Sequence, residues 1–215
     1  SVIVTIHGTN DTPVISAGTG AVTEDTVLTT SGTLTITDAD AGQASFVAQP
    51  STAGTYGTFS IDASGNWIYN LNNASVQALG AGQTLSETFT VASVDGSTSS
   101  VIVTIHGTND TPVISAGTGA VTEDTVLSTS GTLTITDTDA GQASFVAQPS
   151  TAGAYGTFSI DAAGNWTYTL NNASVQALGA GQTLSETFTV ASADGSTSSV
   201  IVTIHGTNDT PVISA

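Results

Sequence analysis

The chain has 215 residues, 39% of them hydrophobic, and its 17 acidic residues face no Lys or Arg, so the net charge is −17. Nucleic acids and anionic membranes are bound through Lys and Arg, and both classes of partner are therefore excluded. Cys is also absent, which excludes disulfides and thiolate chemistry.

A repeat with a period of 99 residues organises the chain. The tetrapeptide Asn-Asp-Thr-Pro occurs at 10–13, 109–112 and 208–211, and residues 10–108 differ from 109–207 at seven positions. We expect two domains of one fold, at 9–107 and 108–206. Residues 1–8 are expected to be the last strand of a preceding repeat, either loose or paired with another molecule, and 207–215 the linker and start of the next repeat.

Within the first repeat, β-branched and aromatic segments alternate with clusters of Gly, Asp, Asn and Ser. The strands predicted from this pattern are 13–23, 33–37, 45–49, 58–61, 66–71, 87–94 and 99–106. Seven short strands predict an all-β sandwich of the immunoglobulin type. Residues 73–80 form the one segment with a helical pattern, and they are expected to cross between the two sheets.

The differences between the two copies test the alternation of the strands. Ile68 and Asn70 are replaced by Thr in the second repeat, and both lie on the strand parity opposite Trp67 and Tyr69. Val94 is replaced by Ala in the second repeat, and it too belongs to the face of its strand opposite that of Phe89 and Val91. We therefore expect the aromatic residues to point into the core and the variable positions to point outward.

The acidic loops are expected at the two poles of each sandwich. Consecutive strands run antiparallel, which places Asn10-Asp11, Asp38 to Gly42 and the turns at 62–65 and 95–96 at the N-terminal pole. Glu24 and Asp25 fall at the opposite pole, with Glu87 assigned beside them and the exit linker. Without basic partners, clustered carboxylates must be solvated, protonated or neutralised by a bound cation.

Oxygen ligands with no Cys, and with a single His in each period, favour Ca²⁺ at the junction between repeats. The predicted ligands are Glu24, Asp25, Asn109, Asp110, Asp137 and Asp139, with Asp161 and Asp194 nearby, and their equivalents Asn10, Asp11, Asp38, Asp40, Glu123, Asp124, Asn208 and Asp209. The alternative is that these residues only form turns, as Asp, Asn and Gly commonly do. Asp62 and Asp161 fit plain hairpin turns better than ligands. Neither an EF-hand loop nor a glycine-rich nonapeptide calcium repeat is present.

The runs GTLTITDADAG, GNWIYNLNN, VQALGAGQTLSETFTV, VDGS and VIVTIHGTNDTP together resemble the VCBS repeat of giant bacterial RTX-type surface adhesins. The resemblance covers essentially the whole chain. It implies a cadherin-like or immunoglobulin-like sandwich, export by type I secretion, and a role as an extender or stalk in surface attachment and biofilm formation. The linker TNDTP is similar to the calcium-binding linkers of cadherins, although it lacks the second Asn and the preceding Asp of that pattern.

We therefore expect non-enzymatic extender repeats, secreted to the bacterial cell surface, monomeric, and rigidified by calcium. Their partners are the adjacent repeats of the same chain and cell-surface or matrix components. Each period has a single His, and duplicating a whole active site every 99 residues would be unusual. The alternative function is a calcium-dependent carbohydrate- or partner-binding module, which would need an exposed aromatic surface.

Overall fold

A computed structural model describes residues 1–211 and divides the chain into two compact units, Ser1–Asn109 and Asp110–Ala215. In the first unit the elements are β1 (Val14–Ile15), β2 (Gly18–Thr23), β3 (Thr29–Thr33), β4 (Ile36–Thr37), β5 (Gln49–Ala53), β6 (Gly57–Ile61), β7 (Asn66–Leu71), the 3-10 turn η1 (Asn73–Ser75), β8 (Thr84–Ala92) and β9 (Thr98–His106). The fold is an all-β sandwich, as the sequence predicts.

The second unit repeats this order of elements. It contains β10 (Val113–Ile114), β11 (Gly117–Thr122), β12 (Ser128–Thr132), β13 (Ile135–Thr136), β14 (Gln148–Ala152), β15 (Gly156–Ile160), β16 (Asn165–Leu170), η2 (Asn172–Ser174), β17 (Thr183–Ala191) and β18 (Thr197–His205). Among residues 1–211 the two 3-10 turns are the whole helical content, and no helix there is long and apolar enough to cross a membrane.

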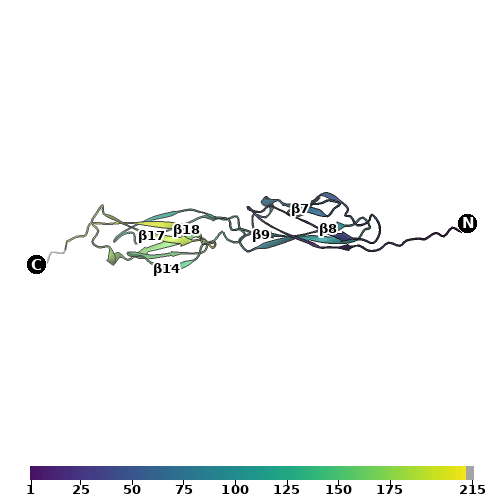
Figure 1. Ribbon diagram of the computed structural model, residues 1–215. Helices are drawn as coiled ribbons and strands as arrows, with labels where there is room; N and C mark the ends of the chain where they lie inside the picture. Colours follow the sequence, from purple (N-terminus) through teal and green to yellow (C-terminus); the bar gives the residue numbers. More distant parts are fainter. Residues whose placement is uncertain (212–215) are drawn as a thin grey trace. The chain divides into compact units, whose positions relative to one another are not determined.

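Two sheets enclose the core of each unit. In the first unit one sheet has the order β2-β9-β8 and the other β3-β7-β6-β5, and Figure 1 shows β7 in one layer with β8 and β9 in the other. β2 runs parallel to β9, so the first long strand and the last one lie side by side. The second unit has the equivalent sheets, β11-β18-β17 and β12-β16-β15-β14.

Strand alternation places the aromatic residues inside, as predicted. Trp67 and Tyr69 on β7 are 2% and 0% exposed, and the rings of Phe59 and Phe89 stack between the sheets with centroids 4.7 Å apart. All seven positions that differ between the repeats are exposed in both units. The substitutions therefore leave the core unchanged.

Glycine makes room for the tryptophan. Gly32 lies opposite Trp67 across the β3–β7 pair, and a Cβ atom at Gly32 would come within 2.7 Å of the indole ring. The indole covers the strand where a side chain would otherwise stand, so this glycine is a packing requirement.

Three predicted elements differ from the observed ones. The strand expected at 33–37 is divided between Thr29–Thr33 and Ile36–Thr37, and the strand expected at 45–49 lies at Gln49–Ala53, because pairing with β7 and β6 sets the limits of β3 and β5. The helix expected at 73–80 is reduced to the turn Asn73–Ser75, which has no side-chain cap. It does connect the two sheets, from β7 to β8.

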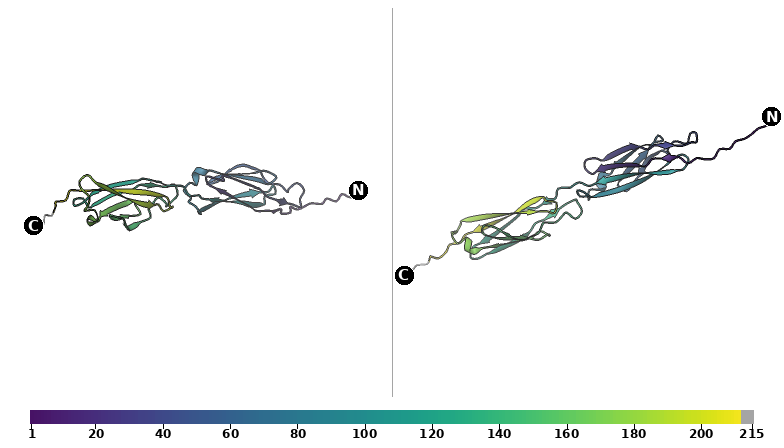
Figure 2. Two further views of the ribbon diagram at one scale, coloured as in Figure 1. Left: turned by 60° about the vertical axis from the view of Figure 1, so that its left-hand side comes forward. Right: turned by 60° about the horizontal axis from the view of Figure 1, so that its bottom comes forward.

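The terminal segments carry no described strand. Val2, Ile3 and Ile6 are 88–90% exposed, and the start of the chain extends away from the first sandwich (Figure 2). The last strand of a preceding repeat, predicted at 1–8, therefore does not form a strand here. The start of a further repeat, predicted at 207–215, extends beyond the described residues.

Candidate cation-binding ends of each repeat

The downstream end of a unit is the end where the chain leaves β9 or β18. A three-residue loop, residues 24–26, closes between Thr23 and Val27 in the first unit. It buries Glu24, which is 1% exposed and whose Oε1 accepts a hydrogen bond of 2.8 Å from the amide of Thr108. A buried carboxylate is thus tied to the first residues of the linker.

Asp25 follows in the left-handed region, with φ of 59°. Its Oδ1 accepts hydrogen bonds from Asn73 Nδ2 at 2.7 Å and Gln77 Nε2 at 2.9 Å. These bonds, the Asn73 bond foremost, hold the pKa of the Asp25 carboxyl below its usual range. The side chain is therefore anionic and fixed in place by the η1 segment.

The same end of the second unit includes the linker aspartate. Glu123 is fully buried, its Oε1 accepts from the amide of Thr207 at 2.6 Å, and its Oε2 has no hydrogen-bond partner. Loss of hydration and repulsion by Asp124 and Glu123 raise the pKa of Asp209. Three carboxyl groups thus gather at one end of a unit that has no internal cation to offset them.

The upstream end, where the preceding linker joins, is built from the Asp-X-Asp loop. Asp40 Oδ2 accepts from the amide of Asp11 at 2.7 Å, and Asp38 Oδ1 accepts from the amide of Asp40 at 2.8 Å. Asn10 Nδ2 lies 3.5 Å from Asp95 Oδ2. The linker and two acidic loops therefore meet at this end.

The second unit keeps this arrangement with deeper burial. Asp139 is 2% exposed, its Oδ2 accepts from the amide of Asp110 at 3.0 Å, and its own amide donates to Asp137 Oδ1. Asp38 Oδ2, Asp137 Oδ2 and Asp139 Oδ1 are buried without a hydrogen-bond partner. Orphaned buried carboxylate oxygens are costly in a folded protein and call for a ligand.

These donor sets fit a hard cation. Within residues 1–211, no three Asp, Glu or His side chains lie close enough to hold a metal ion by themselves. Ca²⁺ uses six to eight oxygens and accepts carbonyl, amide and water ligands besides carboxylates. The orphaned oxygens Asp137 Oδ2 and Glu123 Oε2 fit such a mixed ligand set at the two ends.

The structure thus brings most predicted site residues to one of two ends. The upstream set is Asn10, Asp11, Asp38 and Asp40, repeated as Asp110, Asp137 and Asp139; the downstream set is Glu24 and Asp25, repeated as Glu123, Asp124 and Asp209. Asn109 directly follows Thr108, and Asn208 donates to the carbonyl of Asp209 at 3.4 Å. Asp194 shares its sequence position with Asp95 in the neighbouring repeat.

Two turn aspartates bond within their own turns. Asp62 Oδ1 accepts from the amides of Ser64 and Asn66, and Asp62 Oδ2 accepts from Asn66 Nδ2. Asp161 makes the equivalent bonds in the second unit. Their carboxylates serve the hairpin itself.

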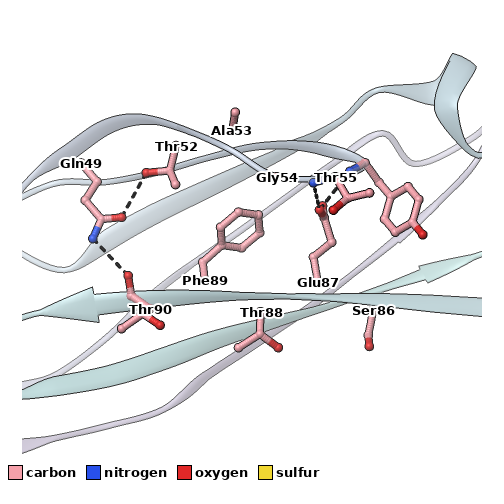
Figure 3. A pocket seen from close by; sticks show the side chains of 11 residues that line it. Gln49, Thr52, Ala53, Gly54, Thr55, Ser86, Glu87, Thr88, Phe89 and Thr90 are labelled. Atoms are coloured by element: carbon pink, nitrogen blue, oxygen red, sulfur yellow. Dashed lines mark hydrogen bonds between the residues drawn. The ribbon is translucent and has the colours of Figure 1, made fainter.

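The assignment of Glu87 to the downstream end is wrong. Glu87 lies at the edge between the two sheets, in a groove of about 830 Å³, below Gly54 and Thr55 (Figure 3). Its Oε1 accepts from the amides of Thr55 and Tyr56, and its Oε2 accepts from the Tyr69 hydroxyl at 2.5 Å. Residue 87 stands inside β8, away from its first residue, so its inward parity points it at the core edge.

Burial and this carboxylate raise the pKa of Tyr69. The groove therefore holds a carboxylate whose two oxygens accept three hydrogen bonds. This pattern is that of a structural clamp between the sheets.

Asn73 and Gln77 have a role that the sequence does not predict. Their pattern predicts a helix capped by the Asn, whereas their side-chain amides bond to Asp25, about fifty residues away in the chain. The sequence feature that could indicate this role is an Asn and a Gln four residues apart, just after a strand.

Comparison with known families identifies the fold. A family model described as "Bacterial cadherin-like domain" matches residues 10–107 and again 109–206. The chain belongs to this family. No curated protein sequence matches it at a significant level. It contains two tandem copies of the bacterial cadherin-like domain.

Solved cadherin structures share the fold at low sequence identity. Drosophila N-cadherin EC1-4 aligns with 93% of this chain and 50% of its own, at 16% identity and a TM-score of 0.53. Protocadherin gammaB7 EC3-6 aligns with 91% of this chain and 48% of its own, also at 16% identity and 0.53. The chain spans about half the length of these structures.

Proposed function

We propose that this chain forms extender repeats of a secreted bacterial cell-surface adhesin, with Ca²⁺ bound at the ends of each repeat. The observation that carries the proposal is the pairing of buried, partnerless carboxylate oxygens with a chain that has no Lys or Arg. Only an external cation can neutralise these groups while they stay ionised.

The residues that would hold the ion follow from the two ends. At the downstream end they are Glu24, Asp25 and Asn109, and in the second repeat Glu123, Asp124, Asn208 and Asp209. At the upstream end they are Asp11, Asp38 and Asp40, and Asp110, Asp137 and Asp139. Bound calcium supplies positive charge that offsets carboxylate repulsion.

The residues of the chain itself prepare these ends. The backbone amide of Thr108 binds Oε1 of the buried Glu24. The amide of Asp110 binds Oδ2 of the buried Asp139, whose Oδ1 has no hydrogen-bond partner and is left for a ligand. Pro13 and Pro112 are buried beside the linker and restrict Thr12 and Thr111 to extended backbone. Both features favour a defined path for the linker.

The role as an extender rests on repetition and on the family. Two near-identical domains add length or avidity more readily than they add new chemistry. The resemblance to RTX adhesins extends the proposal to type I secretion, surface attachment and biofilm formation. Trp67 and Trp166 are buried and offer no stacking surface for a sugar, so the carbohydrate-binding alternative gains no support from them.

Chelation tests the proposal directly. The two-repeat chain is compared in calcium and in excess EGTA, and we measure its melting temperature and its largest dimension by small-angle X-ray scattering. We expect chelation to lower the melting temperature and to change the scattering profile, because repulsion among the carboxylates returns. If neither quantity changes, calcium has no part in this protein.

A further inference from the structure

The crossover between the sheets reaches back to the acidic loop through side-chain amides. Asn73 makes two bonds to Asp25: its Oδ1 accepts from the Asp25 amide at 2.9 Å and its Nδ2 donates to Asp25 Oδ1 at 2.7 Å. Gln77 Nε2 adds a third bond at 2.9 Å. Two residues of one short segment thus bind the backbone and the side chain of a single aspartate.

The aspartate that they bind has an unusual backbone. Among residues 1–211, Asp25 and Asp124 are the residues other than Gly with positive φ, at 59° and 62°. Glycine meets this conformation at no steric cost, whereas an Asp there needs local support. An Asp at this position in both repeats therefore indicates that the carboxylate itself is used.

The amides also orient that carboxylate. Oδ1 of Asp25 is taken by Asn73 and Gln77, and Oδ2 lies 3.5 Å from the hydroxyl of Thr108, at the start of the linker. Thr108 also donates its backbone amide to Glu24. Oδ2 of Asp25 therefore faces the same residue that binds the buried Glu24.

The second unit shows an unsatisfied oxygen at the same place. Asn172 and Gln176 hold Asp124 as their equivalents hold Asp25, with bonds of 2.7 to 3.0 Å. Glu123, next in sequence, is fully buried and its Oε2 has no partner. None of the seven differences between the repeats falls on these residues.

We propose that Asn73 and Gln77, with Asn172 and Gln176, are positioning residues that preform the downstream cation site of each repeat. They lock the aspartate in its left-handed conformation and point its second oxygen toward the linker before a cation arrives. The inference rests on the proposed function, because the cation is calcium at this same end. It adds that the crossover sets the affinity without contributing a ligand.

The test uses the whole 215-residue chain with Asn73→Ala and Asn172→Ala combined. The matched control combines Ser75→Ala and Ser174→Ala, since Ser75 and Ser174 bond only within the same crossover and to Tyr56 or Tyr155. Calcium affinity is measured by isothermal titration calorimetry. We expect about tenfold weaker binding in the Asn variant and unchanged binding in the control.

A second readout needs no calcium. In EGTA, amide hydrogen exchange at Asp25 and Asp124 should become faster in the Asn variant and stay unchanged in the control. Equal affinities for wild type and Asn variant, an equal loss in the control, or unchanged exchange would each overturn the positioning role. A wild-type chain that binds no calcium overturns the proposed function instead, and with it the cation role assigned here.

Discussion

Each repeat buries two glutamates, and their surroundings differ. In the second unit Glu186 is 8% exposed and accepts hydrogen bonds from the Tyr155 amide and the Tyr168 hydroxyl, one on each oxygen. Glu123 is fully buried and accepts one bond on Oε1, while Oε2 has no partner. Both carboxylate oxygens of Glu186 therefore accept hydrogen bonds, whereas one oxygen of Glu123 accepts none.

The difference separates a structural carboxylate from a candidate ligand. Glu186 spans the edge between the sheets, and its donors come from the protein itself. Glu123 stands at the end of the sandwich near Asp124 and Asp209, and its charge is one of those that raise the pKa of Asp209.

The largest effect is expected from Glu186→Ala. The change leaves the Tyr168 hydroxyl and a buried amide without an acceptor and opens a cavity, so the free energy of unfolding should fall by about 3 kcal/mol. Chemical denaturation in calcium and in EGTA measures it. The loss should be the same in both buffers, and a loss confined to calcium would contradict a structural role.

Unlike Glu186→Ala, Glu123→Gln should lower the free energy of unfolding in calcium but not in EGTA. In EGTA its stability should stay close to that of wild type, because the glutamine keeps the shape and removes an uncompensated charge. In calcium it should lose most of the stabilisation that the ion gives, about 2.7 kcal/mol when free calcium is one hundred times the dissociation constant. Stability equal to wild type in calcium would remove Glu123 from the ligand set.

Two neighbouring carboxyl groups should titrate in opposite directions. In EGTA the pKa of Asp124 should lie below its usual range, first because of the bond from Asn172, and that of Asp209 above it. Stability due to Asp124 is then present above its unfolded pKa, near 3.9, and is lost as pH falls through its lower folded value. Asp209 should have the opposite effect: its charged form destabilises the fold, and the fold gains stability as pH falls and Asp209 is protonated, because repulsion from Asp124 and Glu123 is then relieved.

Carbonyl-detected NMR titration of the carboxyl carbons measures both pKa values. Asn172→Ala should raise the pKa of Asp124 toward its usual value. Calcium should lower the pKa of Asp209, since a bound cation offsets its neighbours. Parallel shifts of the two groups would show that they do not share one end of the repeat.

The smallest effect on stability is expected when a residue of one repeat is replaced by its counterpart in the other repeat. Ile68→Thr introduces the residue that the second repeat has at the equivalent position, and Ile68 is 45% exposed. The free energy of unfolding should change by less than about 0.5 kcal/mol. Trp67→Ala, next to it in sequence, should cost several-fold more, and equal effects would contradict the inward parity of β7.

Several features of the fold and of the candidate site could be predicted from the sequence. Comparing two copies revealed which face of β7 is buried, because Ile68 and Asn70 vary while Trp67 and Tyr69 do not. Period and loop order also placed Asp40 with Asp11 and Glu24 with the exit linker. These assignments follow from strand alternation, which is a local property of the chain.

Other features depended on contacts between distant residues. Periodicity and charge were enough to predict the repeated sandwich, the inward aromatic residues and the acidic loops at opposite ends. Neither could predict that Glu87 bridges the two sheets or that Asn73 binds Asp25. These hydrogen bonds join side chains 18 and 48 residues apart in the chain and therefore depend on how the strands pack, which no local pattern encodes.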